Sequence, residues 1–421
     1  MNQTVGWNRY LWLALLVALL WRLVLAFGVQ HIVSIPPARL CLIAGDAEGY
    51  WELAGKIVAG QEYSLHEPPR RLLRMPGFPL LLAIPRFAVG DNPFAARLFL
   101  VLVGTLACAL TYWLGRELAG DFVGIVACAY TALSPTMALY SVLFLSETAF
   151  AVTILASLIA ATRLVKASSQ DAQGTNQVDL KGGKLSLLTG ALVGVATYMR
   201  PTWLLVGPGL AVFLILFGKG PTLTRLLQAL LIGLGLAVTL APWTYRNFVI
   251  TGHAITTTLW SGPSLYDGLN PTANGESDMR FFDQENLMSS MSEYEMNREY
   301  NRRAWAFAKQ NPAKVAWLAW EKQKRYWSPS PNSDQFKRIE IQIVAWTFYL
   351  PLIVLAIIGA WTARHDFWLL ILTAAPILYF GVLHLLFVGS LRYRLPAEYP
   401  LAVLSAIGLS RWQKLQTTSS V

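Results

Sequence analysis

Long apolar runs constrain this chain more than any other feature of its sequence. Residues 10–29, 94–114 and 339–361 are three of several runs of about 20 mostly apolar residues, the length that crosses a bilayer as a helix. Only 14% of the 421 residues are charged, whereas a soluble domain carries about 25%. The sequence therefore predicts an all-α polytopic membrane protein, a bundle of about ten transmembrane helices.

Polar stretches divide the expected helices into three parts. We expect an N-terminal membrane module over residues 1–245 that contains a first outer loop at 30–79, an outer, partly helical region at 246–338, and C-terminal transmembrane helices with a short tail at 339–421. Residues 46–59 have the apolar spacing of an amphipathic helix lying on the membrane, and residues 77–89 are too short to span it. Residues 166–184 have the composition of a flexible linker. The expected spans are residues 10–29, 94–114, 122–140, 148–165, 185–198, 203–217, 226–243, 339–361, 367–387 and 399–409.

The distribution of positive charge predicts the topology. Lys166, Lys219 and Arg364 lie in connections on one side of the expected bundle, and the positive-inside rule places that side in the cytoplasm. Both termini then lie in the cytoplasm, while the two larger loops lie outside a plasma membrane, which we expect to be a bacterial inner membrane. This rule accounts for the net charge of +10 without a nucleic-acid partner, and the membrane lipids remain the expected surroundings.

Several charged residues fall on the predicted outer side. Asp46 and Glu48 open the amphipathic helix, Arg74 precedes a Pro-Gly turn, and Glu147 opens the fourth span. Helix capping and turn chemistry explain each of them individually. Arg22, within the first span, is either a functional intramembrane arginine or a side chain that extends to the interface.

Three arginines on the predicted outer side are a further indication of a functional site. Arg200, Arg392 and Arg394 lie in what we read as short outer loops, where few positive charges are expected, and an anion bound at the outer interface explains them. Arginine holds phosphate through bidentate, charge-assisted hydrogen bonds, and a carboxylate can accept a proton from a hydroxyl. Together these groups favour transfer of a sugar from a lipid phosphate to a hydroxyl.

The order of motifs resembles a known family, the GT-C class of membrane glycosyltransferases, in particular glycosyltransferase family 39, with the protein O-mannosyltransferases and lipid A aminoarabinose transferases. The motifs are Gly45-Asp46-Ala47 with Tyr50, Arg74-Met75-Pro76-Gly77-Phe78-Pro79, Ser146-Glu147-Thr148, Thr197-Tyr198-Met199-Arg200-Pro201, Ala241-Pro242-Trp243-Thr244-Tyr245-Arg246-Asn247, Gly268-Leu269-Asn270-Pro271 and Arg392-Tyr393-Arg394-Leu395-Pro396.

The resemblance implies an inverting glycosyltransferase with a polyprenyl-phosphate sugar donor. It implies that Asp46 is the catalytic base or orients the acceptor, that Glu147 is a second catalytic acid group, and that Arg74 contacts the donor phosphate. The sugar and the outer acceptor, whether protein, lipid or glycan, stay open. The further candidate substrate-binding residues are Arg200, Arg392, Arg394, Tyr50, Glu48 and Arg246.

Two alternative functions remain open. A lipid or sugar transporter or flippase is the rival function, although no inverted repeat with midplane polar groups is evident. A non-catalytic scaffold with the same fold is the second alternative. No cofactor is required by this reading, but Asp46 and Glu48 could supply oxygen ligands to a divalent cation.

Overall fold

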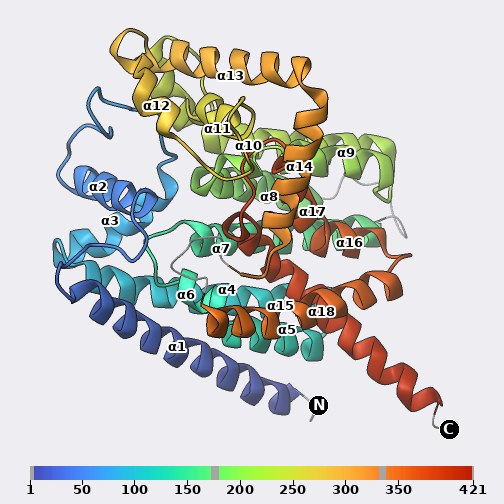
Figure 1. The fold of residues 1–421 in the computed structure, drawn as a ribbon. Helices are drawn as coiled ribbons and strands as arrows, with labels where there is room; N and C mark the ends of the chain where they lie inside the picture. The colour runs from blue at the N-terminus through green and yellow to red at the C-terminus, as the bar shows by residue number, and fades with distance from the viewer. Residues whose placement is uncertain (1–3, 172–179, 331–337, 420–421) are drawn as a thin grey trace.

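The computed structural model describes residues 4–171, 180–330 and 338–419, and within these ranges the regular elements are helices (Figure 1). A single isolated β-bridge joins Leu65 and Arg70 in the same ranges. The predicted all-α class is therefore confirmed.

The first half of the chain supplies the helices around the first outer loop. They are α1 (Thr4–Ser34), α2 (Asp46–Val58), α3 (Gly77–Val89), α4 (Pro93–Ala119), α5 (Asp121–Leu133), α6 (Pro135–Tyr140), α7 (Glu147–Asp171), α8 (Leu180–Met199), a 3₁₀ turn η1 (Pro201–Trp203), and α9 (Val206–Phe217). The amphipathic helix predicted at 46–59 is α2, and the short apolar segment predicted at 77–89 is α3.

The second half supplies the outer helices and the C-terminal spans. They are α10 (Thr222–Thr251), α11 (Ser261–Gly268), α12 (Arg280–Glu285), η2 (Leu287–Ser289), α13 (Glu293–Gln310), α14 (Pro312–Trp327), α15 (Ile339–Thr362), α16 (Phe367–Thr373), α17 (Ala375–Leu383) and α18 (Leu391–Ser419). In Figure 1, α13 lies along the top of the molecule, above α11 and α12.

Five helices in the described ranges are long and apolar enough to cross a membrane. They lie in α1, α4, α7, α10 and α15, and shorter apolar helices occur at Gly77–Val89, Asp121–Leu133 and Pro201–Phe217. The predicted number of about ten spans stays a prediction.

Two expected spans are each divided into two helices. The span expected at 122–140 breaks at Ser134, whose Oγ accepts the amide of Met137 at 3.5 Å and caps α6, with Pro135 at its first position. The span expected at 367–387 is α16 followed by α17, with Pro376 near the start of α17. Serine caps and proline at the first helical turn favour a new helix start, so these residues explain both divisions.

Two expected loops are wholly or partly helical. The Arg392–Pro396 stretch lies inside α18, which begins at Leu391 and continues through Pro396 and Pro400. The expectation of a short loop at Arg392–Pro396 is therefore wrong, because neighbouring helices make proline tolerable inside a packed membrane helix. In the expected linker at 166–184, α7 extends to Asp171 and α8 begins at Leu180, while residues 172–179 lie outside the described ranges.

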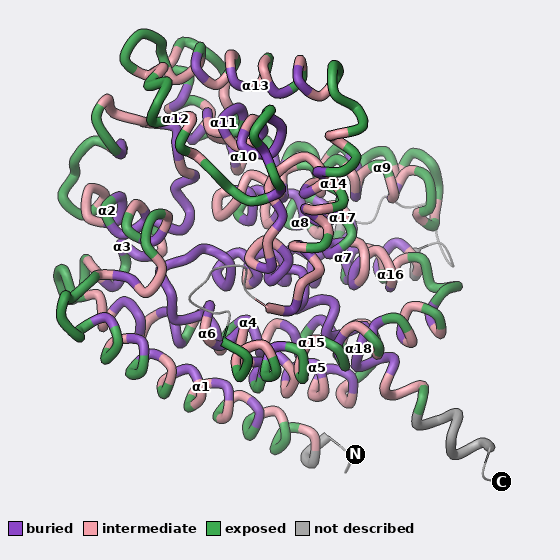
Figure 2. Tube along the Cα trace, viewed as in Figure 1, coloured by how far each residue is buried: buried purple, intermediate pink, exposed green. Residues whose placement is uncertain are grey.

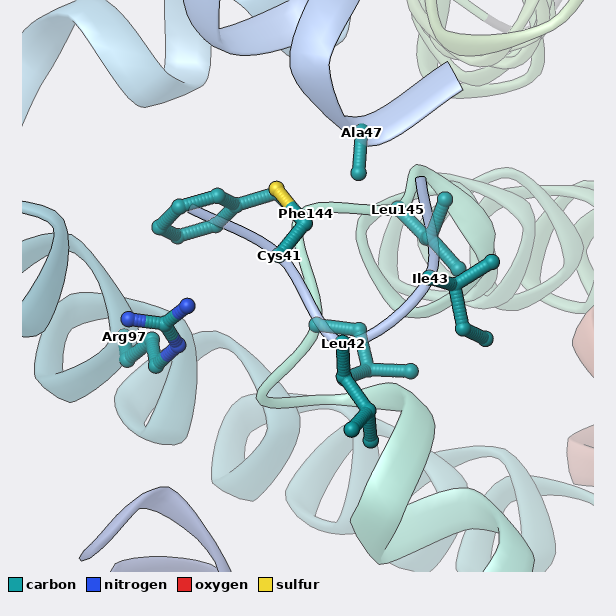
Figure 3. A pocket seen from close by; sticks show the side chains of 8 residues that line it. Cys41, Leu42, Ile43, Ala47, Arg97, Phe144 and Leu145 are labelled. Atoms are coloured by element: carbon teal, nitrogen blue, oxygen red, sulfur yellow. The ribbon is translucent and has the colours of Figure 1, made fainter. Parts of the chain in front are cut away.

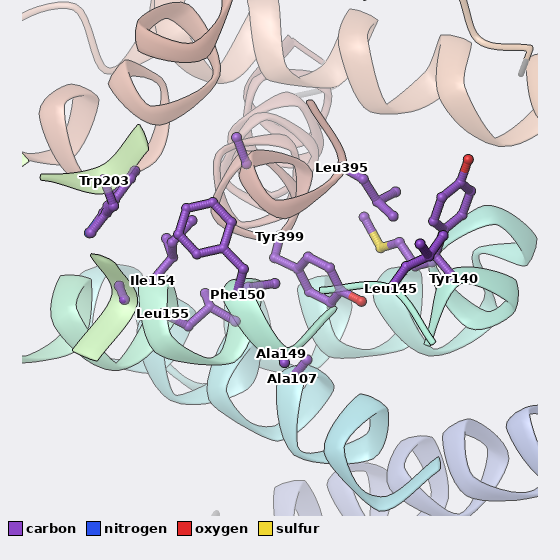
Figure 4. Close-up of a cluster of buried hydrophobic side chains, with 14 of the residues drawn as sticks. Ala107, Tyr140, Leu145, Ala149, Phe150, Ile154, Leu155, Trp203, Leu395 and Tyr399 are labelled. Carbon is purple, nitrogen blue, oxygen red and sulfur yellow. The ribbon is translucent and has the colours of Figure 1, made fainter. Parts of the chain in front are cut away.

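Helix α7 occupies the centre of the helical bundle. Phe150, Ile154 and Leu155 of α7 pack beside Trp203 and beside Tyr399 of α18 in the buried cluster of Figure 4. In Figure 2, α1 alternates between buried and exposed residues along its length, as expected for a helix with one outer face. The buried centre fixes the N-terminal end of α7, where Glu147 lies.

The structure rules out one of the two interpretations of Arg22 in the first span. Its side chain is fully buried, and its guanidinium donates to the carbonyl oxygens of Thr131 and Ala132 at 3.1 and 3.4 Å. These carbonyls are at the C-terminal end of α5, where cations are favoured. Arg22 therefore does not extend to the interface; it binds carbonyl oxygens at the C-terminal end of α5.

Candidate active site

Five ionisable side chains from distant parts of the sequence meet beside the first outer loop. Asp46 is the first residue of α2, Glu147 the first residue of α7, and Arg392 the second residue of α18. Arg74 lies just before α3, and Arg200 lies directly after α8. All five were predicted from the sequence as site residues, and the fold brings them into one connected group, which we call the ion row.

The outer part of the ion row centres on Asp46. One carboxylate oxygen accepts a short hydrogen bond from Nη2 of Arg74, and the other accepts from Nη2 of Arg392 at 2.9 Å. Gly45 precedes Asp46 with φ of 89°, a left-handed conformation that glycine adopts without strain. This conformation allows the chain to turn directly into α2 and present Asp46 between the two arginines.

The inner part of the ion row centres on Glu147. Its Oε1 accepts from Nε of Arg392 and from Nη2 of Arg200, the latter at 2.8 Å, and Nε of Arg200 donates to the hydroxyl of Ser146 at 2.8 Å. Oε2 of Glu147 is buried and has no hydrogen-bond partner among the residues that the structure describes. Arg392 thus contacts both carboxylates and joins the two parts into one network.

The ion row carries a surplus of positive charge. Three arginines accompany two carboxylates, and side-chain exposure falls from 29% at Asp46 to none at Glu147. Burial favours the neutral acid, but the charges of Arg74 and Arg392 outweigh it and hold the pKa of Asp46 well below its usual range. A partly exposed outer end with excess guanidinium groups is suited to an anionic group such as phosphate.

Packing of main chain against main chain sets the distance between the Arg74 and Arg200 segments. A Cβ built on Gly77 would lie 2.6 Å from the carbonyl carbon and oxygen of Tyr198 and 3.0 Å from the nitrogen of Met199. Only glycine permits this close approach. The start of α3 therefore lies directly on the end of α8.

The other predicted residues of the first loop lie at the edge of the ion row. Tyr50 is buried, with its ring 5.6 Å from the Arg74 guanidinium and edge-on to Phe78. Glu48 instead accepts the backbone N–H of Gly45 at 3.3 Å. This contact is the reciprocal half of a capping interaction, so Glu48 shapes the start of α2 without touching the arginines.

Two predicted arginines lie apart from the ion row. Arg394 is buried and bonds to Glu398 at 2.6 Å and to the carbonyls of Tyr326 and Ser328. Arg246 donates to the carbonyl oxygens of Tyr63 and Arg71 at 3.2 and 3.3 Å. Neither contacts Asp46 or Glu147, and both bind main-chain carbonyls of neighbouring segments.

Sequence reasoning did not select two aromatic residues beside the ion row. The Tyr393 ring lies 5.7 Å from the Arg200 guanidinium and stacks on His384 at 4.4 Å between ring centroids. His384 in turn contacts the carbonyl of Val388 through Nδ1 at 2.7 Å. The position of Tyr393 between Arg392 and Arg394 was the available signal, but the helical conformation that turns it towards Arg200 was not predicted.

A small pocket lies beside the start of α2. Figure 3 shows Ala47 of α2 above it and the guanidinium of Arg97 at its side. Arg97 is already bonded to Gln30 and to the carbonyl of Leu40, both at 2.6 Å. The lining residues are Cys41, Leu42, Ile43, Ala47, Arg97, Leu143, Phe144 and Leu145. The pocket is mainly apolar and is not lined by any of the five residues of the ion row.

The residues of the ion row do not fit a divalent cation. Within the described ranges, no three His, Cys, Asp or Glu side chains are grouped to hold a metal ion. Both oxygens of Asp46 face arginines, and Glu48 bonds to Gly45. A cation at Asp46 would lie next to two guanidinium groups, so we derive no chemical step that uses a metal.

Comparison with known proteins places this geometry in context. Residues 74–245, less than half of the chain, match the family model described as "Dolichyl-phosphate-mannose-protein mannosyltransferase". No curated protein matches this sequence. The matched segment contains Arg74, Glu147 and Arg200, but Asp46 and Arg392 lie outside it.

Solved structures share the fold at low sequence identity. The oligosaccharyltransferase AglB of Archaeoglobus fulgidus, solved with an inhibitory peptide and a dolichol-phosphate, aligns with a TM-score of 0.62 and 14% identity over 99% of this chain and 52% of its own. A complex of that oligosaccharyltransferase with Zn and sulfate aligns with a TM-score of 0.58 and 14% identity, over 97% of this chain and 50% of its own. This chain thus spans about half the length of those proteins.

A weaker alignment relates the chain to ArnT from Cupriavidus metallidurans, solved with undecaprenyl phosphate. The TM-score is 0.41 at 16% identity, over 92% of this chain and 78% of ArnT. The matched family model and the fold of AglB confirm the predicted resemblance. The chain is thus an all-helical membrane protein with the GT-C fold, and its residues 74–245 match the mannosyltransferase family model.

Proposed function

We propose that this protein transfers a sugar from a polyprenyl-phosphate donor to a hydroxyl acceptor at the outer face of the membrane, with inversion at the anomeric carbon. The ion row carries the proposal, because it combines carboxylates with an excess of arginines at its partly exposed end. The match of residues 74–245 to a mannosyltransferase family model supports the same reaction class.

In the proposed reaction, Arg74 and Arg392 bind the donor phosphate and Asp46 activates the acceptor. The acceptor oxygen gives its proton to Asp46 and forms a bond to the anomeric carbon, while the bond from that carbon to the phosphate oxygen breaks. The phosphate leaves as an anion, which the guanidinium groups stabilise as its charge develops. No general acid is needed, because a phosphate leaving group is already a stable anion.

The resting contacts of Asp46 suggest how its basicity is controlled. Both of its oxygens accept from arginines, and these charges depress its pKa, so the free carboxylate is a poor base. A donor phosphate competes for Arg74 and Arg392. Loss of these contacts raises the proton affinity of Asp46, so the carboxylate becomes a base when the donor is bound.

Glu147 has a different proposed role. It is fully buried, and Arg200 and Arg392 both contact its Oε1. A buried carboxylate between two arginines orients them for an incoming anion. We therefore propose that Glu147 fixes the phosphate-binding arginines and that Asp46 takes the proton.

The alternative function is movement of a lipid or sugar across the membrane. A transporter would place its charged groups near the bilayer midplane. Here Asp46 and Arg74 belong to the first outer loop and its interfacial helix, and their side chains are 29% and 25% exposed. This position at one edge of the bundle favours the transferase.

The test is a transfer assay on Asp46→Asn. Membranes that contain the wild-type protein are incubated with a panel of polyprenyl-phosphate sugars, and consumption of each donor is measured. Asp46→Asn should abolish consumption of the donor that the wild type uses, with normal expression. Glu52→Gln is the matched control, because Glu52 is on the same helix, is 52% exposed and pairs with Lys56. Full activity of Asp46→Asn would contradict its role as the base.

Cysteine labelling tests the proposed topology. Glu276 and Lys219 are exposed and lie in predicted outer and cytoplasmic connections. In a background without the native cysteines, a membrane-impermeant maleimide should label Cys at position 276 in intact cells, and at position 219 only after permeabilisation. The opposite pattern would place the ion row in the cytoplasm and reject the proposed reaction.

A further inference from the structure

We infer that Glu293, in the second outer region, is a positioning residue for Arg74 and couples the outer helices to the donor-phosphate site. This inference rests on the proposed function, because it assigns Arg74 to the donor phosphate. Glu293 is the first residue of α13 and lies 219 positions after Arg74 in the sequence. No motif in the sequence connects the two.

The carboxylate of Glu293 binds the backbone just before Arg74. Oε2 accepts the N–H of Arg71 at 2.8 Å, and Oε1 accepts the N–H of Leu72 at 3.2 Å. The carbonyl of Leu72 accepts the N–H of Leu259 at 2.9 Å. Both N–H groups and the Leu72 carbonyl of this backbone are therefore bonded to the second outer region.

Helix-dipole stabilisation alone does not explain the direction in which the Glu293 carboxylate points. An acidic residue in the first turn of a helix is favoured by the dipole wherever its side chain points. The neighbouring Glu295 follows that pattern, since it bonds to Ser292 at the start of its own helix. Glu293 instead directs both of its oxygens to the first outer loop.

Other contacts hold the same segment, residues 62–75. Arg246 at the end of α10 donates to the carbonyls of Tyr63 and Arg71, and the Tyr63 hydroxyl lies 3.3 and 3.2 Å from the carbonyl oxygens of Arg74 and Met75. The positive charges of Arg71, Arg246 and Arg70 interact with the Glu293 carboxylate. The Arg74 backbone is thus held in part through Tyr63, and Tyr63 through Arg246.

The consequence is a connection between the outer helices and the ion row. The start of α13 cannot move away from the first outer loop without leaving the N–H groups of Arg71 and Leu72 unpaired. Leaving these amides unpaired is unfavourable, so movement of α13 is coupled to the position of Arg74. A molecule that binds the outer helices would therefore change the affinity of the ion row for phosphate.

Glu293→Gln tests the role of the carboxylate. The amide oxygen can accept one N–H, but the amide nitrogen faces the other N–H as a second donor. We expect binding of undecaprenyl phosphate in detergent to weaken about tenfold, the ratio that corresponds to loss of one satisfied amide. Glu295→Gln is the matched control: it lies on the same helix, and glutamine retains the capping interaction.

A double-mutant cycle separates positioning from general destabilisation. If Glu293 acts through Arg74, Glu293→Gln should have no further effect on binding in an Arg74→Ala background. Hydrogen exchange supplies a readout that needs no ligand: the amides of Arg71 and Leu72 should exchange faster in Glu293→Gln than in Glu295→Gln. Additive losses of binding, or unchanged exchange, would overturn the inference.

The outcomes also separate this inference from the proposed function. If the wild type binds undecaprenyl phosphate and Arg74→Ala weakens binding, but Glu293→Gln does not, the inference fails and the proposed function stands. If the wild type does not bind the lipid phosphate, the proposed function fails, and the role of Glu293 in donor binding fails with it.

Discussion

Arg392 and Arg394 lie two residues apart on α18 and have opposite surroundings. Arg392 is 19% exposed and contacts both Asp46 and Glu147 in a row with more arginines than carboxylates. Arg394 is 1% exposed, pairs with Glu398, and its remaining contacts are main-chain carbonyls and the Tyr349 ring. Two residues along a helix differ by about 200° in direction, so one motif supplies both a site residue and a core residue.

The comparison shows which feature marks the functional arginine. Both side chains form ion pairs, so an ion pair alone does not distinguish them. Arg394 has a balanced, enclosed set of partners that leaves no place for a ligand. Arg392 shares its carboxylates with other arginines at a partly exposed site, and an incoming anion can replace those carboxylates.

The largest expected effect follows from removing the enclosed arginine. Arg394→Ala leaves Glu398 buried without its partner, which should lower the free energy of unfolding by about 3–5 kcal/mol. Thermal unfolding in detergent would show a reduced Tm and a reduced yield of monodisperse protein. The double variant Arg394→Met/Glu398→Leu removes both charges and should recover most of the loss. An unchanged Tm in Arg394→Ala would mean that this pair does not stabilise the core.

Removal of the exposed arginine should instead affect transfer. Arg392→Ala removes a group that stabilises the leaving phosphate and should reduce kcat/KM about 10²- to 10³-fold. Asp46 and Glu147 keep Arg74 and Arg200 as partners, so the Tm should fall less than in Arg394→Ala. Kinetics with the identified donor and unfolding of both variants measure this difference. The reverse pattern, with stability lost and kcat/KM retained, would remove the contrast between the two arginines.

Replacement of Arg392 by lysine tests whether its positive charge alone is sufficient. Arg392 reaches Glu147 through Nε and Asp46 through Nη2, and the single ammonium of lysine lacks this forked geometry. Arg392→Lys should therefore retain the charge but lose about tenfold in donor affinity, equivalent to about 1.4 kcal/mol. The KM for the donor is the measurement. Wild-type behaviour would mean that charge alone, without the fork, is sufficient.

The smallest expected effect concerns pH. Because the folded pKa of Asp46 lies below its usual value, its ionised form contributes stability above the unfolded value of about 3.9. That contribution is lost only as the pH falls through the lower, folded pKa. The Tm difference between the wild type and Asp46→Asn should thus stay constant from about pH 8 to about pH 5. A difference that disappears near pH 6 would show that the arginines do not control this carboxylate.

The sequence predicted much of the ion row because helix ends and turns leave local signals. Asp46 and Glu147 begin helices, and Arg74 precedes a Pro-Gly turn, so each could be placed at the outer edge of the bundle. The positive-inside rule then made Arg200 and Arg392 conspicuous. These signals depend on neighbouring residues, and one sequence is enough to read them.

Contacts between distant segments could not be predicted in this way. Arg392 and Arg394 looked equivalent because their stretch was read as a loop, in which side chains have no fixed direction. Glu293 was not selected from the sequence, since its partners are backbone amides that carry no sequence signal. The divisions at Ser134 and before Ala375 follow from a serine cap and from prolines at helix starts, local signals that a reading of hydropathy alone does not include.

The contact between Gly77 and Tyr198 has a consequence for how the site tolerates substitution. It joins the segments of Arg74 and Arg200 through main-chain atoms, so the spacing of these two backbone segments does not depend on the arginine side chains. Substitutions at the arginines would therefore change how strongly an anion is held without moving the two backbone segments, whereas any side chain at position 77 would collide with Tyr198 and force the segments apart.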